Sequence, residues 1–167
     1  LEAYGTPDKS KPEYGEYDFL RGEWEASMQT IAEDGTTTPI EAKAYITGFY
    51  HSDGRTFQTC FEAPGFHSTD VRAFEESSGN WRASFTNAQS QRWNSLKSVK
   101  VGDTMETLVP GGYAGTADFD TKTVMHSIAD ESFRNDVFQR DKGSDVWRKT
   151  FEMVYRRLPT DPNGPRC

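Results

Sequence analysis

Two histidines are the side chains best suited to acid–base chemistry near neutral pH, where an imidazole gains and loses a proton. His126 alternates with Val124 and Ile128, and these apolar neighbours predict that its ring points inward. His67 follows the Pro64–Phe66 segment at the start of an expected strand, which places it at a rim. If both histidines line one cavity, they could serve as acid and base for a lyase, isomerase or cyclase. The alternatives are a structural His126, hydrogen-bonded to a neighbouring strand, and an exposed loop position for His67.

The third histidine gives no indication of a metal site. His51 lies in an expected turn, and no two histidines have ligand spacing such as His-x-His. The sequence also lacks a phosphate-binding glycine loop, a nucleophile elbow and a Cys/His zinc pattern, which argues against nucleotide-dependent enzymes and most hydrolases. We therefore expect no metal and no cofactor.

Large aromatic side chains make the strongest case for a binding site. Eleven Phe, seven Tyr and four Trp accompany a hydrophobic fraction of only 34%. An interior lined by flat rings accepts a small hydrophobic or aromatic molecule, although such rings also simply fill a small barrel. The candidate ligand-binding rings are Tyr50, Phe57, Phe61, Trp81, Phe85, Trp93 and Trp147.

Arginines recur along the middle of the chain, and an inward arginine would bind a carboxylate, phenolate or enolate through charge-assisted hydrogen bonds. Arg82 shares its side of a strand with Ser84, so we expect it to point outward. Arg72 shares its side with Asp70 and Phe74, which leaves its direction open. We keep Arg72 as a candidate ligand contact.

The spacing of apolar residues predicts that these side chains stand on short antiparallel strands. From Trp24 the sequence alternates, with Ala26 and Met28 on the same face and charged or polar residues on the other. Turn sequences such as Asp34-Gly35 separate the segments, and no long helix or crossover interrupts them. We predict an all-β fold, a single antiparallel up-and-down β-barrel of about 8–10 strands, with a short N-terminal helical turn over residues 16–21.

The 167 residues amount to one domain. We place the barrel at residues 16–158, after a flexible N-terminal arm (1–15) and before a C-terminal tail (159–167) that is rich in Pro and Gly. Cys60 falls in an expected strand and Cys167 ends the tail. A bridge between them is geometrically feasible, but two cysteines do not make a disulfide framework, and we favour two free thiols.

The net charge of −7, with scattered basic residues, argues against nucleic acid and anionic membranes as partners. No apolar run approaches the ~18 residues of a membrane span. We expect a soluble protein whose partner is a small molecule, and a homodimer stays open. The chain begins at Leu1 rather than Met, so we expect that a segment was removed, and both a cytoplasmic and an exported location stay open.

The segment Phe19-Leu20-Arg21-Gly22-Glu23-Trp24 resembles the start of the lipocalin-like (calycin) barrels. It looks most like a bacterial family known only as lipocalin-like domains of unknown function. That family carries a Trp-Arg strand after a Gly/Asn turn, as at Asn80–Arg82, and finishes on a strand rich in aromatic residues and arginine, as at Trp147–Arg157. The resemblance covers about residues 16–158.

This resemblance implies that Trp24 plugs one end of the barrel and that an arginine near the end of the chain packs on its ring. Side chains alternate between the two faces of a strand, so Arg157 lies on the same face as Phe151 and Tyr155, whereas Arg156 lies on the other face. We therefore favour Arg157 as the arginine that packs on Trp24. The ligand mouth is then the opposite end, where the Gly-rich segment 110–115 is the candidate loop.

Two functions follow as hypotheses. The first is binding of a small hydrophobic or aromatic molecule in the barrel without chemistry. The alternative is a cofactor-free lyase, isomerase or cyclase that uses His126 or His67 with a Tyr or Arg to hold an anion. Related barrels can hold haem, so haem bound through His126 is a third and more remote reading.

Overall fold

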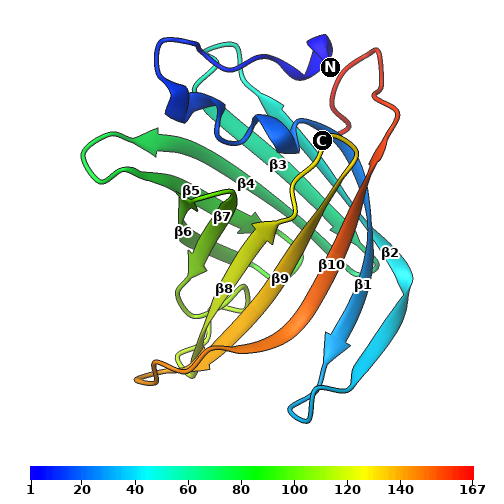
Figure 1. Ribbon diagram of the computed structural model, residues 1–167, viewed down its shortest axis with the longest axis vertical. Coiled ribbons are helices and arrows are strands. Elements are labelled where there is room, and N and C mark those ends of the chain that lie inside the picture. Colours follow the sequence, from blue (N-terminus) through cyan, green and yellow to red (C-terminus); the bar gives the residue numbers. More distant parts are fainter.

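Ten antiparallel strands close into one barrel in the computed structural model, which describes residues 1–167 (Figure 1). The all-β, up-and-down architecture predicted from the sequence is confirmed. Each strand pairs with its neighbours in sequence, and β1 closes the barrel on β10. The strands are β1 (Gly22–Ile31), β2 (Thr37–Tyr50), β3 (Thr56–Ala63), β4 (Phe66–Glu75), β5 (Asn80–Asn87), β6 (Arg92–Val101), β7 (Thr104–Val109), β8 (Phe119–His126), β9 (Ser132–Asp141) and β10 (Arg148–Leu158).

Three short 3-10 helices precede the barrel, namely η1 (Glu2–Tyr4), η2 (Pro12–Gly15) and η3 (Asp18–Leu20). The last of them enters the end of the barrel at which β1 begins. Gly48 on β2 makes this approach feasible, because a Cβ there would collide with the backbone oxygen of Leu20. The structure contains no helix long and apolar enough to cross a membrane.

Aromatic side chains pack this end of the barrel. Tyr17, Leu20, Trp24 and Phe133 each have at most 1% of their surface exposed. The indole nitrogen of Trp24 donates a hydrogen bond to the Leu20 carbonyl, 3.0 Å away, and the Phe133 ring packs edge-on against the Trp24 ring. We call this end of the barrel the closed end.

Arg157, near the end of β10, connects several segments of the chain at the closed end. Its guanidinium lies over the Trp24 ring, 4.1 Å from the ring centre. The same group donates hydrogen bonds to the carbonyls of Arg21 (2.7 Å), Phe19 (3.4 Å) and Asp130 (2.6 Å). The register of β1 and β10 places Trp24 directly opposite Arg157. One side chain therefore ties η3, the first strand and the last strand to each other.

Both chain ends lie outside the barrel at its closed end (Figure 1). The segment that we expected as a flexible arm packs there through buried tyrosines: Tyr4 is fully buried, and its hydroxyl donates to Glu23 of β1 at 2.8 Å. The backbone N–H of Asp161, in the tail, donates to the Tyr4 hydroxyl at 3.0 Å. The first and last segments of the chain thus cover the outer surface of β1 at Glu23.

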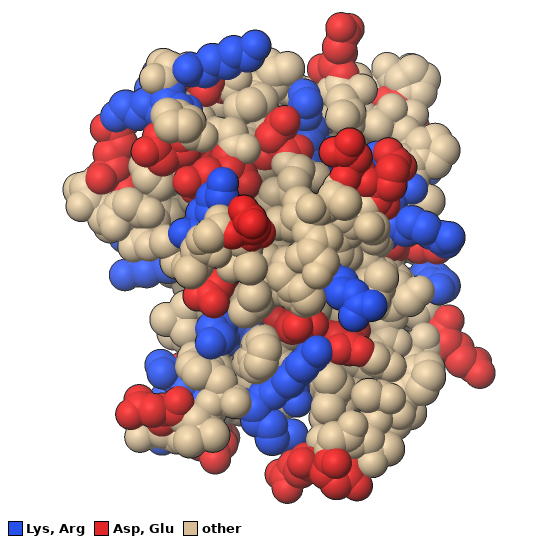
Figure 2. All heavy atoms as spheres, viewed as in Figure 1, with Lys and Arg blue, Asp and Glu red and all other residues tan.

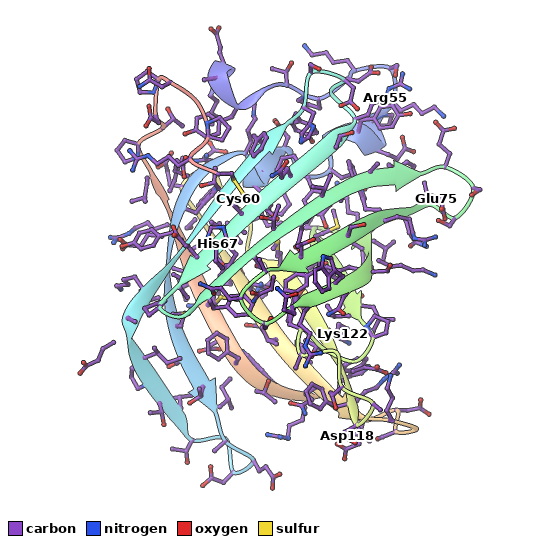
Figure 3. The ribbon with its side chains drawn as sticks, turned by 180° about the vertical axis from the view of Figure 1, so that it is seen from behind. Arg55, Cys60, His67, Glu75, Asp118 and Lys122 are labelled. Atoms are coloured by element: carbon purple, nitrogen blue, oxygen red, sulfur yellow. A yellow bond between two sulfur atoms is a disulfide. The ribbon has the colours of Figure 1, made fainter.

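A disulfide joins Cys60 of β3 to Cys167, so the expectation of two free thiols is wrong (Figure 3). Their Cα atoms lie 5.8 Å apart, although 107 residues separate them in sequence. The reason is the direction of Cys60. Its neighbours Thr59 and Phe61 face inward, so Cys60 points outward, and the tail runs over that surface.

We expect Arg157→Ala to lower the free energy of unfolding by about 2–4 kcal/mol, because it removes a cation–π contact and three charge-assisted hydrogen bonds. Urea unfolding followed by tryptophan fluorescence measures the change. The matched control is Arg156→Ala: that side chain is 77% exposed, and its one ion pair, with Glu25, is worth at most about 1 kcal/mol. Equal losses in the two variants would contradict a specific role for Arg157.

We also expect a reducing agent to lower the stability of the protein by about 2–4 kcal/mol, because reduction opens a loop that spans most of the chain. The double variant Cys60→Ser, Cys167→Ser should have the lower stability with and without reductant. Thermal unfolding of both proteins with and without dithiothreitol tests this. A wild-type midpoint that reduction leaves unchanged would argue against the disulfide.

Candidate functional site

The interior of the barrel changes character along its axis. At the closed end Trp24 and Phe133 are completely buried, and a second buried cluster of Ala83, Phe85, Leu96 and Val109 packs the β5–β7 side of the other half. Towards the other end, inward residues such as Phe61, Phe66 and Phe151 are only partly buried, although their strand positions face the interior. Their remaining exposed surface therefore opens into the barrel. We call this half of the interior the open half.

An ion pair lies on the inner face of β4. Arg72 Nη2 donates to Asp70 Oδ2 at 3.0 Å and to Thr59 Oγ1 of β3 at 2.9 Å. The Arg72 guanidinium also lies over the Tyr17 ring, 4.6 Å from its centre. Arg72 is only 6% exposed, and the neighbouring inward residue on β5 is Ala83. The pair thus rests on the aromatic floor of the closed end and faces the open half.

Two polar atoms of this pair have no hydrogen-bond partner. Arg72 Nε and Asp70 Oδ1 are both buried without a hydrogen bond, and so is Asn135 Oδ1 on β9. An unpaired buried polar atom costs about 1–3 kcal/mol, so such atoms are infrequent in folded proteins. Arg72 Nε can donate and Asp70 Oδ1 can accept.

Burial shifts the pKa values of two residues at this ion pair, Asp70 and Tyr113. Burial raises the pKa of the Asp70 carboxyl, and the attraction of Arg72 offsets only part of that effect. Burial, and then the Asp70 carboxylate, raise the pKa of the Tyr113 hydroxyl, which therefore stays neutral and able to donate. Both effects follow because a low-dielectric site disfavours the charged form.

Tyr113 reaches this layer from the loop between β7 and β8, at the end of the barrel opposite Trp24. Its ring packs on Phe85, with 5.1 Å between the ring centres. Gly112 before it has φ 62°, and a Cβ there would meet the Phe119 ring at 2.6 Å. The Gly-rich sequence is thus what lets the loop turn inward and carry Tyr113 into the mouth.

The sequence-predicted rings fall into three groups. Tyr50, Phe57 and Trp81 face inward but belong to the packed floor, and the Trp81 indole donates to Glu16 at 3.0 Å. Phe61 and Phe85 face the open half beside the Asp70–Arg72 pair. Arg72, whose direction the sequence left open, points inward.

Trp93 and Trp147, the third group, face outward and do not line the interior, which corrects that expectation. Trp93 is 65% exposed, because Asn94 and Leu96 take the inward positions on β6. Trp147 lies just before β10, where Lys122 Nζ and the Arg140 guanidinium pack on its ring at 4.8 and 4.5 Å. A register shift between Lys149 and Phe151 breaks the parity that linked Trp147 to the inner face.

His126 also faces outward, so the expectation of an inward imidazole is wrong. Met125 holds the inward position on β8, opposite Met105. The argument failed because its apolar guides misled: Val124, on the same side of β8 as His126, itself faces outward, and Ile128 lies beyond the strand after Ser127, which has φ 52°. Haem coordination by His126 inside the barrel loses its geometric basis for the same reason.

His67 points outward as well (Figure 3), and its side chain is 50% exposed with Glu62 3.7 Å away. The two histidines therefore do not share the barrel cavity. The residues that sequence reasoning missed are Asp70, Asn135 and Tyr113. Asp70 carried a signal, because it lies two residues from Arg72 and so on the same face, whereas nothing in the sequence indicated that Tyr113 folds inward.

Similar barrels occur among solved structures. The S-type phycobiliprotein lyase CPES from Guillardia theta aligns with 93% of this chain and all of its own length, with a TM-score of 0.59 and 7% identity. Rv2717c from M. tuberculosis aligns over 89% of this chain and 99% of its own, with a TM-score of 0.56 and 14% identity. No protein-family model and no curated protein matches the sequence. The closed barrel and these likenesses show a lipocalin-like, calycin-type fold.

The raised pKa of Asp70 predicts a specific pH dependence of stability. The folded protein keeps a proton on Asp70 at pH values where the unfolded chain has lost it, so this group stabilises the fold fully below the ordinary aspartate pKa of about 3.9. That contribution is lost as the pH rises through the raised pKa. Asp70→Asn stays neutral throughout.

We therefore expect the unfolding free energy of the wild type minus that of Asp70→Asn to fall as the pH rises above about 3.9. Urea unfolding of both proteins at a series of pH values from the aspartate range to neutrality measures this difference. A difference that stays constant or increases would contradict the raised pKa.

Proposed function

We propose that the barrel binds a small, largely aromatic molecule in the open half of its interior, with a polar end on the Asp70–Arg72 pair. The observation that carries this proposal is the coincidence of partly exposed inward rings with unpaired buried polar atoms in one layer. A barrel that needed only a filled core would place apolar side chains there, since replacing a buried ion pair with apolar residues is often neutral or stabilising.

The lining suits a flat guest with one hydrogen-bonding end. Phe61 and Tyr113 offer partly exposed rings, and aromatic rings prefer stacked or edge-on contacts with other rings. Arg72 Nε supplies a donor and Asp70 Oδ1 an acceptor at the base of this space. The apolar contacts supply most of the affinity, at roughly 25 cal/mol per Å² of surface buried, and the polar pair sets the orientation.

The likeness to CPES is consistent with a ligand-handling barrel, because that protein is a phycobiliprotein lyase with the same overall fold. At 7% identity no residue role carries over. The competing hypothesis, an enzyme with a cavity histidine, loses support because His126 and His67 lie on the outer surface. Binding without chemistry is the function that the interior favours.

The test is a matched pair of tryptophan substitutions. Ser68, 6% exposed, faces inward opposite Phe61, and Ser84 on the neighbouring strand is exposed on the outer face. We expect the fluorescent probe 1-anilinonaphthalene-8-sulfonate to bind the wild type and Ser84→Trp alike, and Ser68→Trp at least ~10-fold more weakly, because the new indole occupies the guest's space. Circular dichroism verifies that each variant is folded.

The polar end is tested by Asp70→Asn combined with Arg72→Met, which removes both charges together and so leaves neither one unpaired. We expect this variant to bind the anionic probe about 10–100-fold more weakly, the value of one charge-assisted hydrogen bond. Equal affinity in Ser68→Trp and the wild type would contradict interior binding. Native mass spectrometry of protein from its source would reveal a retained ligand.

A further inference from the structure

A serine, a histidine and an aspartate form a hydrogen-bonded series on the outer surface, at the end of β8. Ser127 Oγ lies 2.9 Å from His126 Nδ1, and His126 Nε2 lies 2.9 Å from Asp136 Oδ2 of β9. The site is separate from the barrel interior, because His126 and Asp136 occupy outward positions on adjacent strands.

The direction of each hydrogen bond follows from the chemistry of the groups. A carboxylate only accepts, so Nε2 carries the proton and donates to Asp136. Nδ1 of the neutral ring is then unprotonated and accepts the hydroxyl proton of Ser127. A serine donating to an imidazole that a carboxylate orients is the arrangement that activates a serine as a nucleophile.

Surrounding contacts fix Asp136 in place. Its other oxygen, Oδ1, lies 3.2 Å from Lys149 Nζ, and Lys149 also pairs with Glu152 at 2.6 Å. Asp136 is only 17% exposed and His126 28% exposed. The carboxylate therefore has two defined partners and little freedom to turn away from the imidazole.

The serine itself is exposed and held in an unusual backbone conformation. Ser127 has φ 52°, a region that residues other than glycine enter infrequently and mostly at tight turns and functional sites. This turn ends the alternation of β8 and presents Ser127 at the rim of a surface depression. The depression has a volume of about 590 Å³. Phe19, Met105 and Ile128 form its apolar wall, and the rest of its lining is polar and includes Glu16, Lys100 and Asp103.

From this geometry we propose that Ser127 is the nucleophile of an esterase site for esters of small apolar carboxylic acids. The hydroxyl proton of Ser127 passes to His126 Nδ1 as Oγ bonds to the ester carbonyl carbon. The bond from that carbon to the alkoxy oxygen then breaks, and the proton on Nδ1 passes to the departing alkoxide, which leaves as an alcohol. Water, deprotonated by His126 Nδ1, attacks the acyl-serine, and Oγ takes the proton back as the carboxylic acid leaves.

Asp136 acts through His126 and is a positioning residue. Its hydrogen bond keeps the proton on Nε2 and so leaves Nδ1 free to accept from Ser127. The apolar wall of Phe19, Met105 and Ile128 sets the acyl preference, since a depression of this size has room for a short acyl chain. The sequence did not reveal this site, because it lacks a nucleophile-elbow motif and the activated serine stands at a strand end.

A fluorophosphonate probe, which bonds covalently to activated serines, tests the proposal on the full-length protein. We expect intact and peptide mass spectrometry to find one adduct, on Ser127, and we expect 4-nitrophenyl acetate to be hydrolysed. Ser127→Ala should abolish both signals, and His126→Ala should slow labelling at least ~100-fold, the usual contribution of a general base. Ser95→Ala, an exposed serine on β6, is the matched control and should behave as the wild type.

For Asp136, kinetics separate positioning from folding. Asp136→Asn should lower kcat for 4-nitrophenyl acetate with little change in KM or thermal midpoint, and Asp136→Glu should restore part of kcat. An adduct at another serine, no adduct at all, or labelling that is as fast in His126→Ala as in the wild type would overturn the proposal. Because Ser68→Trp should keep the esterase signal while losing the interior probe, failure of this site and failure of the binding proposal are distinguishable.

Discussion

The contact between the Arg157 guanidinium and the Trp24 ring is the interaction on which the rest of the architecture depends. It joins the last strand to the first, and its hydrogen bonds to Arg21 and Phe19 hold η3 inside the barrel end. A barrel closed in this way has no exposed strand edge, so its backbone groups are paired all round. The plug also decides where a guest can enter. Because buried rings pack this end, the proposed guest would enter at the opposite mouth, where the loop that carries Tyr113 lies.

The interior, unlike the closed end, contains polar side chains that do not favour the stability of the fold. Asp70 and Arg72 lie in a layer where apolar side chains would pack better, and each keeps an atom without a partner. Burial raises the pKa of Asp70 even with Arg72 adjacent, so the surroundings do not fully compensate its charge. Replacing such a pair with apolar side chains is often neutral or stabilising, so the pair contributes little to the stability of the fold. The aromatic floor, with Tyr17 under the Arg72 guanidinium, supplies the rigid support that a polar anchor in an apolar space needs.

The outer surface carries charges of both signs, and they are interspersed on the face shown in Figure 2. This mixture fits a net charge of only −7 over the whole protein.

The sequence predicts the direction of a side chain well where inward and outward residues alternate regularly along a strand. Along unbroken strands the alternation holds: Trp24, Phe57, Phe85 and Arg157 all lie on the faces that parity indicates. It fails at interruptions. The register shift between Lys149 and Phe151 places Trp147 outside. For His126 the alternation itself holds, but Val124, which was taken to mark the inner face, points outward with it. The Cys60–Cys167 disulfide and the inward Tyr113 depend on how the tail and a glycine-rich loop cross the barrel, which no local pattern encodes.

The side chains that could take part in binding or catalysis also lie at strand ends and loops. Within a regular strand each side chain faces either the core or the solvent, and neighbours two residues apart repeat the same surroundings. A strand end or a loop releases that constraint and brings adjacent residues together. Ser127 can reach the imidazole of its own neighbour, His126, only because its backbone leaves the extended conformation. Tyr113 reaches the interior only because Gly112 adopts a positive φ. The regular barrel therefore supplies rigid walls, and the departures from regularity supply the groups that could recognise or transform a ligand.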